Sequence, residues 1–106
     1  MGMKSKRKGR VGEREACQAL KEHLGIEAAR SEQYCGRVGD ADLQTDKNIH
    51  FECKRAERLN IYDAVEQAQN ECGEKIPVVL HRRNRGDWLA IVPLSELRRL
   101  VRELSV

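Results

Sequence analysis

Glu52 and Lys54 are the pair of residues in this sequence whose types and spacing most directly suggest chemistry. They lie within the segment 49–55, where apolar side chains alternate with ionisable ones, as in a half-buried strand. Because alternate strand residues share a face, the carboxylate and the ammonium should leave the strand on the same side. Such a pair is often only a surface ion pair worth about 0–1 kcal/mol. Its meaning therefore depends on what the rest of the chain brings near it.

Three carboxylates upstream give the pair a context. Asp40 and Asp42 flank Ala41 at the start of the strand expected over 41–45, and Glu13 lies on a helix expected over 11–24. Extending the apolar stripe of that helix by one turn reaches Glu13 and not Glu15, so Glu13 should face the protein body and Glu15 should point outward. That stripe comprises Ala16, Cys17, Leu20 and Leu24.

These residue types match the needs of phosphodiester hydrolysis. Two or three carboxylate ligands suit a hard cation such as Mg²⁺, which keeps several waters and also binds substrate phosphate. A lysine beside that water can orient it and stabilise the negative charge that develops. Clustered carboxylates without a cation would repel one another. Asp40 lies two residues from Asp42 and could replace it as a ligand.

Further elements are expected on both sides of this group. Short strands fit 26–31, 77–82 and 88–92, and a loop fits 32–40. Helices fit 61–72 and 94–104, the former with an apolar stripe of Ile61, Val65, Ala68 and Cys72 and with Gln67 at its margin as a possible accessory residue. His50 shares the face of Glu52, but a lone histidine there is interpreted as a neighbour rather than a ligand.

The composition indicates one intracellular domain, and its basic clusters are open to two interpretations: they neutralise backbone phosphates, or they are an ordinary solvated surface. The chain has 106 residues, of which 35% are charged, and a formal net charge of +3, with basic residues clustered at both ends. There is no apolar run that could span a membrane and no signal-peptide core, so a cytoplasmic protein is expected. The four cysteines form no C-x-x-C pair, which argues against a cysteine zinc site. Residues 1–9 should be a flexible basic arm and 10–106 the single folded domain.

Four motifs follow one another along the chain: Gly9-Arg10-Val11-Gly12-Glu13-Arg14-Glu15, Arg30-Ser31, Ala41-Asp42-Leu43 and Phe51-Glu52-Cys53-Lys54. In this order they resemble the PD-(D/E)XK nuclease superfamily, and within it the archaeal-type Holliday junction resolvases and their small phage relatives. The resemblance spans most of the chain, because the helix expected over 61–72, the strand at 77–79 and Trp88 also fall where that family places them. Ala41 departs from the superfamily pattern, which has a proline there that donates no ligand.

The resemblance implies a single-domain α/β, restriction-endonuclease-like fold with a mixed central sheet of about five strands flanked by helices. It implies catalysis by Glu13, Asp42, Glu52 and Lys54, with Mg²⁺ (or Mn²⁺ in its place) held by the three carboxylates and the backbone carbonyl of Cys53. It also links Arg14 and Arg30 to DNA contact. Together with the basic clusters, the full set of expected DNA contacts is Lys6, Arg7, Lys8, Arg10, Arg14, Arg30, Ser31, Arg82, Arg83 and Arg85.

The expected function is that of a Mg²⁺-dependent endodeoxyribonuclease acting on branched DNA in recombination and repair, as a Holliday junction resolvase. A homodimer would place two active sites on the two strands of a four-way junction. Two alternatives stay open at this point. One is a less selective nuclease or nickase of phage or repair DNA metabolism. The other is a non-catalytic DNA-binding module on the same fold.

Overall fold

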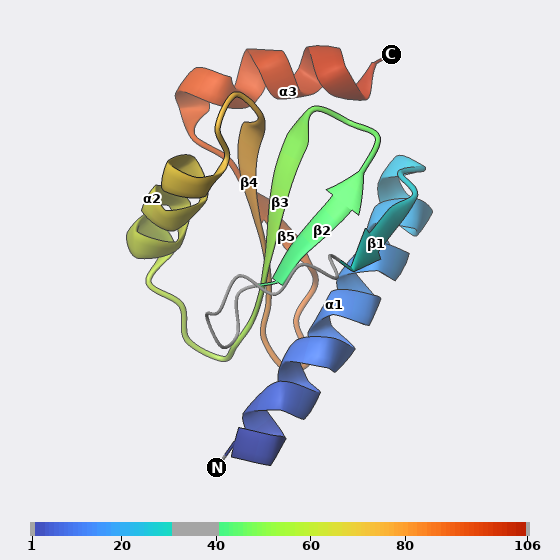
Figure 1. Ribbon diagram of the computed structural model, residues 1–106, viewed down its shortest axis with the longest axis vertical. Coiled ribbons are helices and arrows are strands. Elements are labelled where there is room, and N and C mark those ends of the chain that lie inside the picture. Colours follow the sequence, from blue (N-terminus) through green and yellow to red (C-terminus); the bar gives the residue numbers. More distant parts are fainter. Residues whose placement is uncertain (1, 31–40, 106) are drawn as a thin grey trace.

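A computed structural model of the protein describes residues 2–30 and 41–105, and the side chains of residues 12–30 and 43–105. Within this part, one five-stranded sheet has the order β1-β2-β3-β4-β5 and is accompanied by helices (Figure 1). The α/β fold with a mixed sheet is thus confirmed. The strands are β1 (Ala28–Arg30), β2 (Ala41–Thr45), β3 (Ile49–Arg55), β4 (Ile76–Arg82) and β5 (Leu89–Ile91), and the helices are α1 (Gly2–Leu24), α2 (Ile61–Glu71), the short 3-10 helix η1 (Leu94–Glu96) and α3 (Leu97–Leu104).

The connections explain the mixture of strand directions. β1, β2 and β3 pair antiparallel, with a short turn at 46–48 between the last two, and β5 pairs antiparallel with β4. β3 and β4 are parallel, so the chain must cross over between them, and α2 forms that crossover. Asn60 caps α2, since its side-chain oxygen accepts a hydrogen bond of 3.1 Å from the backbone nitrogen of Asp63.

The two sides of the sheet are covered by different helices. On one side, Ala16 and Leu20 of α1 pack with Phe51 and Cys53 of β3, and α3 adds partly buried leucines to the same cluster. On the other side, two alanines of α2 pack against β4 at Val79. Because strand side chains alternate, the even-numbered residues of β3, which lie next to Phe51 and Cys53 in the strand, face the opposite side, toward α2. The central strand therefore places His50, Glu52 and Lys54 on the α2 side.

The start of α1 differs from expectation for an identifiable reason. α1 begins at Gly2, so residues 2–9, expected as an irregular arm, are helical. Their lysines, arginine and methionine are good helix formers, and the apolar stripe marks only the packed part of a helix. Figure 1 shows these first turns of α1 extending beyond the end of the sheet.

No helix in the described part of the chain is both long and apolar enough to cross a membrane.

The stripe assigned to α2 was right at Ala68 and in part at Val65, but it was wrong at Ile61 and omitted Ala64. Ala64 and Ala68 are buried against the sheet, whereas Ile61 is 46% exposed and Val65 only partly buried. Two small residues one turn apart let the helix approach the sheet closely. With this side of α2 toward the sheet, Gln67, which was expected at the margin of the stripe as a possible accessory residue, contacts Lys54 of β3.

Candidate active site

The site is built on the α2 side of β3, around Glu52 and Lys54. The ammonium of Lys54 donates a hydrogen bond of 2.9 Å to Oε1 of Gln67. α2 runs antiparallel to β3. Glu71, which lies one turn after Gln67 on the helix, is therefore level with Glu52, which lies two residues before Lys54 on the strand. The helix rises about 6 Å over four residues and the strand about 6.6 Å over two. Gln67 thus faces Lys54, and Glu71 faces Glu52 and His50.

Glu52 is the one buried charged or polar residue of the described side chains, with 1% of its surface exposed. Its Oε1 lies 3.0 Å from Nε2 of His50, and its Oε2 has no hydrogen-bond partner among the described residues. Burial raises the pKa of this carboxyl, the neighbouring Glu71 raises it further, and the His50 hydrogen bond opposes both. An isolated carboxylate at this position is costly, and a cation would offset that cost.

The strand register brings Asp42 to the same place. Asp42 is the direct cross-strand partner of Glu52 in the β2–β3 pair. Its side chain lies outside the described part, and Asp40 and Ser31 lie outside the described residues altogether. The backbone alone therefore assembles positions 42, 52 and 54, which are three of the four expected catalytic residues.

Glu13 occupies a different location. Its side chain is only 17% exposed, as its place on the stripe predicted, and it forms an ion pair with Arg30 of β1. It lies on the α1 side, where burial, followed by the Glu13 charge, raises the pKa of the Cys53 thiol to about 12. Among the described residues, His50 and Glu71 lie close enough to Glu52 to share an ion with it, and Glu13 does not. The structure does not bring Glu13 to Glu52.

The sequence interpretation missed an ionic cluster on the α1 side. Glu15 does not point outward: its carboxylate lies 2.6 Å from a guanidinium nitrogen of Arg82 and 3.4 Å from one of Arg55. A glycine inside a helix signals a close approach, and Gly12 shows it, because a Cβ there would lie 2.6 Å from Cβ of Arg55. That glycine and the alternation of β3 were the available signals for this contact.

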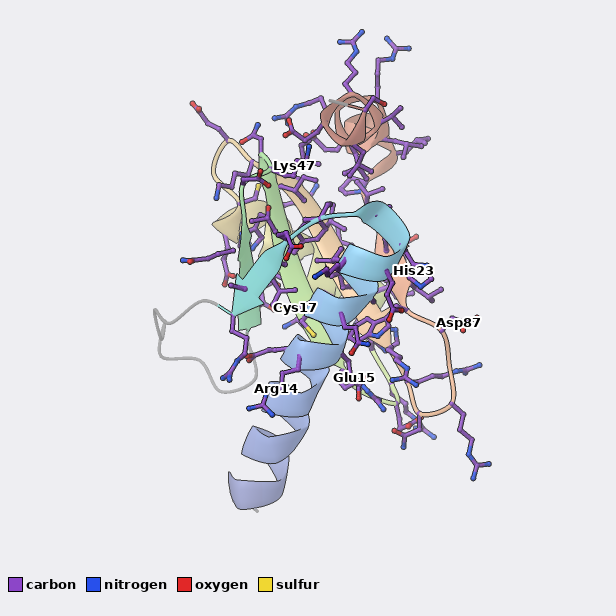
Figure 2. The ribbon with its side chains drawn as sticks, turned by 90° about the vertical axis from the view of Figure 1, so that its right-hand side faces the viewer. Arg14, Glu15, Cys17, His23, Lys47 and Asp87 are labelled. Carbon is purple, nitrogen blue, oxygen red and sulfur yellow. The ribbon has the colours of Figure 1, made fainter. Side chains whose placement is uncertain are left out.

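The expected DNA contacts fall into three groups. Arg83 and Arg85 are exposed in the turn before β5, and Arg14 is exposed on α1, where it leaves the helix in a different direction from Glu15 (Figure 2). Arg30 and Arg82 are engaged in the ion pairs described above, and Arg82 also donates to the carbonyl of Gly86 at 2.8 Å. The third group lies outside the described part: residue Ser31 and the side chains of Lys6, Arg7, Lys8 and Arg10.

A pocket lies on the α1 side, between the end of α1 and the turn before β5. Its lining includes His23, Asp87 and Trp88, and Figure 2 shows the first two on neighbouring parts of this face. Its described lining contains none of the residues around Glu52 and Lys54, but it does include Arg82 of the Glu15 cluster. We therefore place the candidate chemistry at the β3–α2 side and not in this pocket.

Comparison with known proteins adds no assignment, since no family model, no curated protein and no solved structure matches the chain significantly.

Proposed function

We propose that the protein is a metal-dependent DNA endonuclease that cuts branched DNA, with four-way junctions as its preferred substrate. The observation that carries the proposal is the environment of Glu52. This carboxylate is buried, has an oxygen without a partner among the described residues, lies two residues from Lys54 and is the cross-strand partner of Asp42. The α/β fold and the order of the motifs agree with the resemblance to the PD-(D/E)XK nucleases.

In this proposal Asp42, Glu52 and the backbone carbonyl of Cys53 hold Mg²⁺, for which an all-oxygen ligand set is well suited. The unsatisfied oxygen of Glu52 fits that role. When bound, the ion polarises the phosphoryl oxygen and lowers the pKa of its water. Lys54, held by Gln67, supplies a positive charge next to the scissile phosphate, where it stabilises the charge that builds up on the phosphate oxygens. Gln67 thereby acts as a positioning residue.

Glu13 has another task in this arrangement. Since it pairs with Arg30, we assign it to orienting that guanidinium and not to the metal. Arg30 is the cross-strand partner of Leu43, which belongs to the core on the α1 side, so the Arg30 side chain leaves the sheet on the side opposite to Asp42 and Glu52. A phosphate bound by this arginine through two parallel hydrogen bonds would therefore lie on the α1 side of the sheet and not at the metal site.

The test is cleavage of labelled four-way, flap and linear duplex DNA in Mg²⁺ and in EDTA, with Lys54→Ala alongside. Lys75→Ala, which removes an exposed lysine at the start of β4, is the matched control. Paired cuts confined to the junction, dependent on Mg²⁺ and lost only in Lys54→Ala, are the expected result. Cutting of every substrate would remove the junction preference and leave a general nuclease. Binding without cleavage would leave a DNA-binding module.

A further inference from the structure

His50 extends the Glu52 site in a direction that the nuclease chemistry does not use. One imidazole nitrogen of His50, one carboxylate oxygen of Glu52 and one of Glu71 all lie within 4.8 Å of one another. Nε2 of His50 lies 3.0 Å from Oε1 of Glu52. Around an ion with bonds of about 2.1 Å, neighbouring ligand atoms lie about 3.0 Å apart and opposite ones about 4.2 Å apart. The three groups thus need only small movements to share one ion.

A cluster of carboxylates alone would not indicate a ligand, because exposed acidic groups gather for many reasons. Here a second observation points to one. Glu52 is 1% exposed, and its Oε2 has no partner within the part of the chain that the structure describes. A buried carboxylate oxygen left in this condition costs free energy unless a donor or a cation meets it.

The three side chains are carried by regular secondary structure. His50 and Glu52 are two residues apart on the central strand β3, and Glu71 ends α2, which is anchored on the sheet by Ala64 and Ala68. One turn earlier on the same helix, Gln67 is hydrogen-bonded to Lys54. The seam between β3 and α2 therefore has two adjacent parts, one with a lysine and an amide, the other with an imidazole and two carboxylates.

We propose that His50, Glu52 and Glu71 form a divalent-metal site of their own at this seam, one that takes a first-row transition ion such as Mn²⁺ in preference to Mg²⁺. The preference follows from the imidazole, because Mg²⁺ favours oxygen ligands and water, whereas transition ions accept a nitrogen ligand readily. The site shares Glu52 with the proposed nuclease site but does not require Asp42 or the Cys53 carbonyl, and it does not depend on the protein being a nuclease.

The experiment adds MnCl₂ to the metal-free full-length protein and follows bound Mn²⁺ by electron paramagnetic resonance, with pulsed spectra to detect coupling to ¹⁴N. Bound Mn²⁺ with a nitrogen coupling is expected in the wild type. His50→Gln should remove that coupling, and His50→Gln and Glu71→Gln should each weaken binding at least about tenfold, as the loss of even a supporting residue does at many metal sites. Glu66→Gln, which changes an exposed carboxylate on the same helix, should alter neither.

Two further comparisons make the outcome decisive. MgCl₂ should displace the nitrogen-coupled Mn²⁺ only when it is in at least about tenfold excess. Asp42→Asn should keep the nitrogen-coupled Mn²⁺ while losing DNA cleavage. Wild-type protein without nitrogen-coupled Mn²⁺, or a coupling that persists in His50→Gln, overturns the site even if DNA is cut. Nitrogen-coupled Mn²⁺ in a protein that cuts no DNA would overturn the nuclease proposal alone. Glu71 is exposed, so its variant tests the site even if His50→Gln misfolds.

Discussion

The two sides of the sheet hold charge in opposite ways. On the α1 side, the Glu15 carboxylate lies between the guanidiniums of Arg55 and Arg82, so each charge has a partner of opposite sign. On the α2 side, Glu52 is more deeply buried, lies close to a second carboxylate and has an oxygen with no partner among the described residues. The first cluster ties α1 to the sheet, and the second costs stability as it stands.

The difference begins at two consecutive residues of β3. Lys54 and Arg55 leave the strand on opposite sides, because strand side chains alternate. Arg55 donates to Asn84 at 2.9 Å and pairs with Glu15, so it joins three elements of the fold. Lys54 is held by Gln67 next to the unsatisfied Glu52. Groups whose charge is costly for the fold are typical of sites that bind or react, and groups whose charge is matched are typical of scaffolds.

The largest effect should come from removing the Glu52 charge. Glu52→Gln takes away a carboxylate that we propose as a metal ligand, and it should lower the proposed DNA cleavage about 10³-fold, since metal-held charge stabilisation is worth several kcal/mol. The free energy of unfolding should stay the same or rise, because a buried charge is lost. Cleavage is measured under single-turnover conditions and unfolding in urea. Arg55→Ala should reverse this pattern, losing stability but retaining cleavage in its folded fraction. If Glu52→Gln and Arg55→Ala lost cleavage equally, the two sides of the sheet would not differ in function.

The next effect tests how closely α1 approaches β3. In Gly12→Ala, the added Cβ would lie 2.6 Å from Cβ of Arg55, so the helix or the strand must shift. Overpacking of this kind costs about 1–3 kcal/mol, and the better helix propensity of alanine returns up to about 1 kcal/mol. Urea unfolding should therefore show a net loss of stability. A more stable variant would mean that α1 does not lie as close to Arg55 as described.

A smaller loss is expected when the paired cluster loses its carboxylate. Glu15→Gln leaves the guanidiniums of Arg55 and Arg82 near each other without a counter-charge. Breaking a fully buried pair costs about 3–5 kcal/mol, but the Glu15 side chain is 30% exposed, so about 1–2 kcal/mol is expected. Glu22→Gln, on the exposed part of the same helix, should change unfolding by no more than about 0.5 kcal/mol. Similar values for the two variants would show that the cluster contributes nothing beyond a surface ion pair.

The sequence predicted the strands and the grouping of positions on β3 well, because alternation along 49–55 is a local property of the chain. The same pattern could not show which helix covers which side. The choice is made by packing: α1 meets the apolar side at Ala16 and Leu20, and α2 meets the other at Ala64 and Ala68. The small residues of α2 carry little hydrophobic signal, so the stripe was placed on larger side chains instead.

The candidate site was predicted in part for the same reason. Spacing relates Glu52 to Lys54 directly, and a strand pairing relates them to Asp42. Glu13 and Glu15 were harder, since their partners are 17 and 67 residues away in the chain. The stripe on α1 correctly indicated that Glu13 faces the protein body, but it wrongly turned Glu15 outward and did not show that both carboxylates pair with arginines. Glu71, which faces Glu52 from the end of α2, had no motif to mark it.

The smallest effect concerns pH. The pKa of Glu52 is raised above its ordinary value of 4.5 in the folded protein, chiefly by burial. The folded state therefore holds the proton more tightly than the unfolded chain, and stability falls as the pH rises from about 4.5 through the folded pKa. Glu52→Gln removes this contribution, so the stability of the variant relative to wild type should increase across that window and then level off.

Urea unfolding of both proteins in EDTA, at steps between about pH 4 and pH 8, measures the difference directly, because the other titrating groups cancel to first order. Glu74→Gln, at an exposed position after α2, gives the baseline for losing a carboxylate at the surface. A difference that stays flat, or that falls as the pH rises, would mean that the charged form of Glu52 is already well accommodated in the fold. The contrast between the two sides of the sheet would then lose its energetic basis, whereas a rising difference locates the cost at the carboxylate that the metal is proposed to meet.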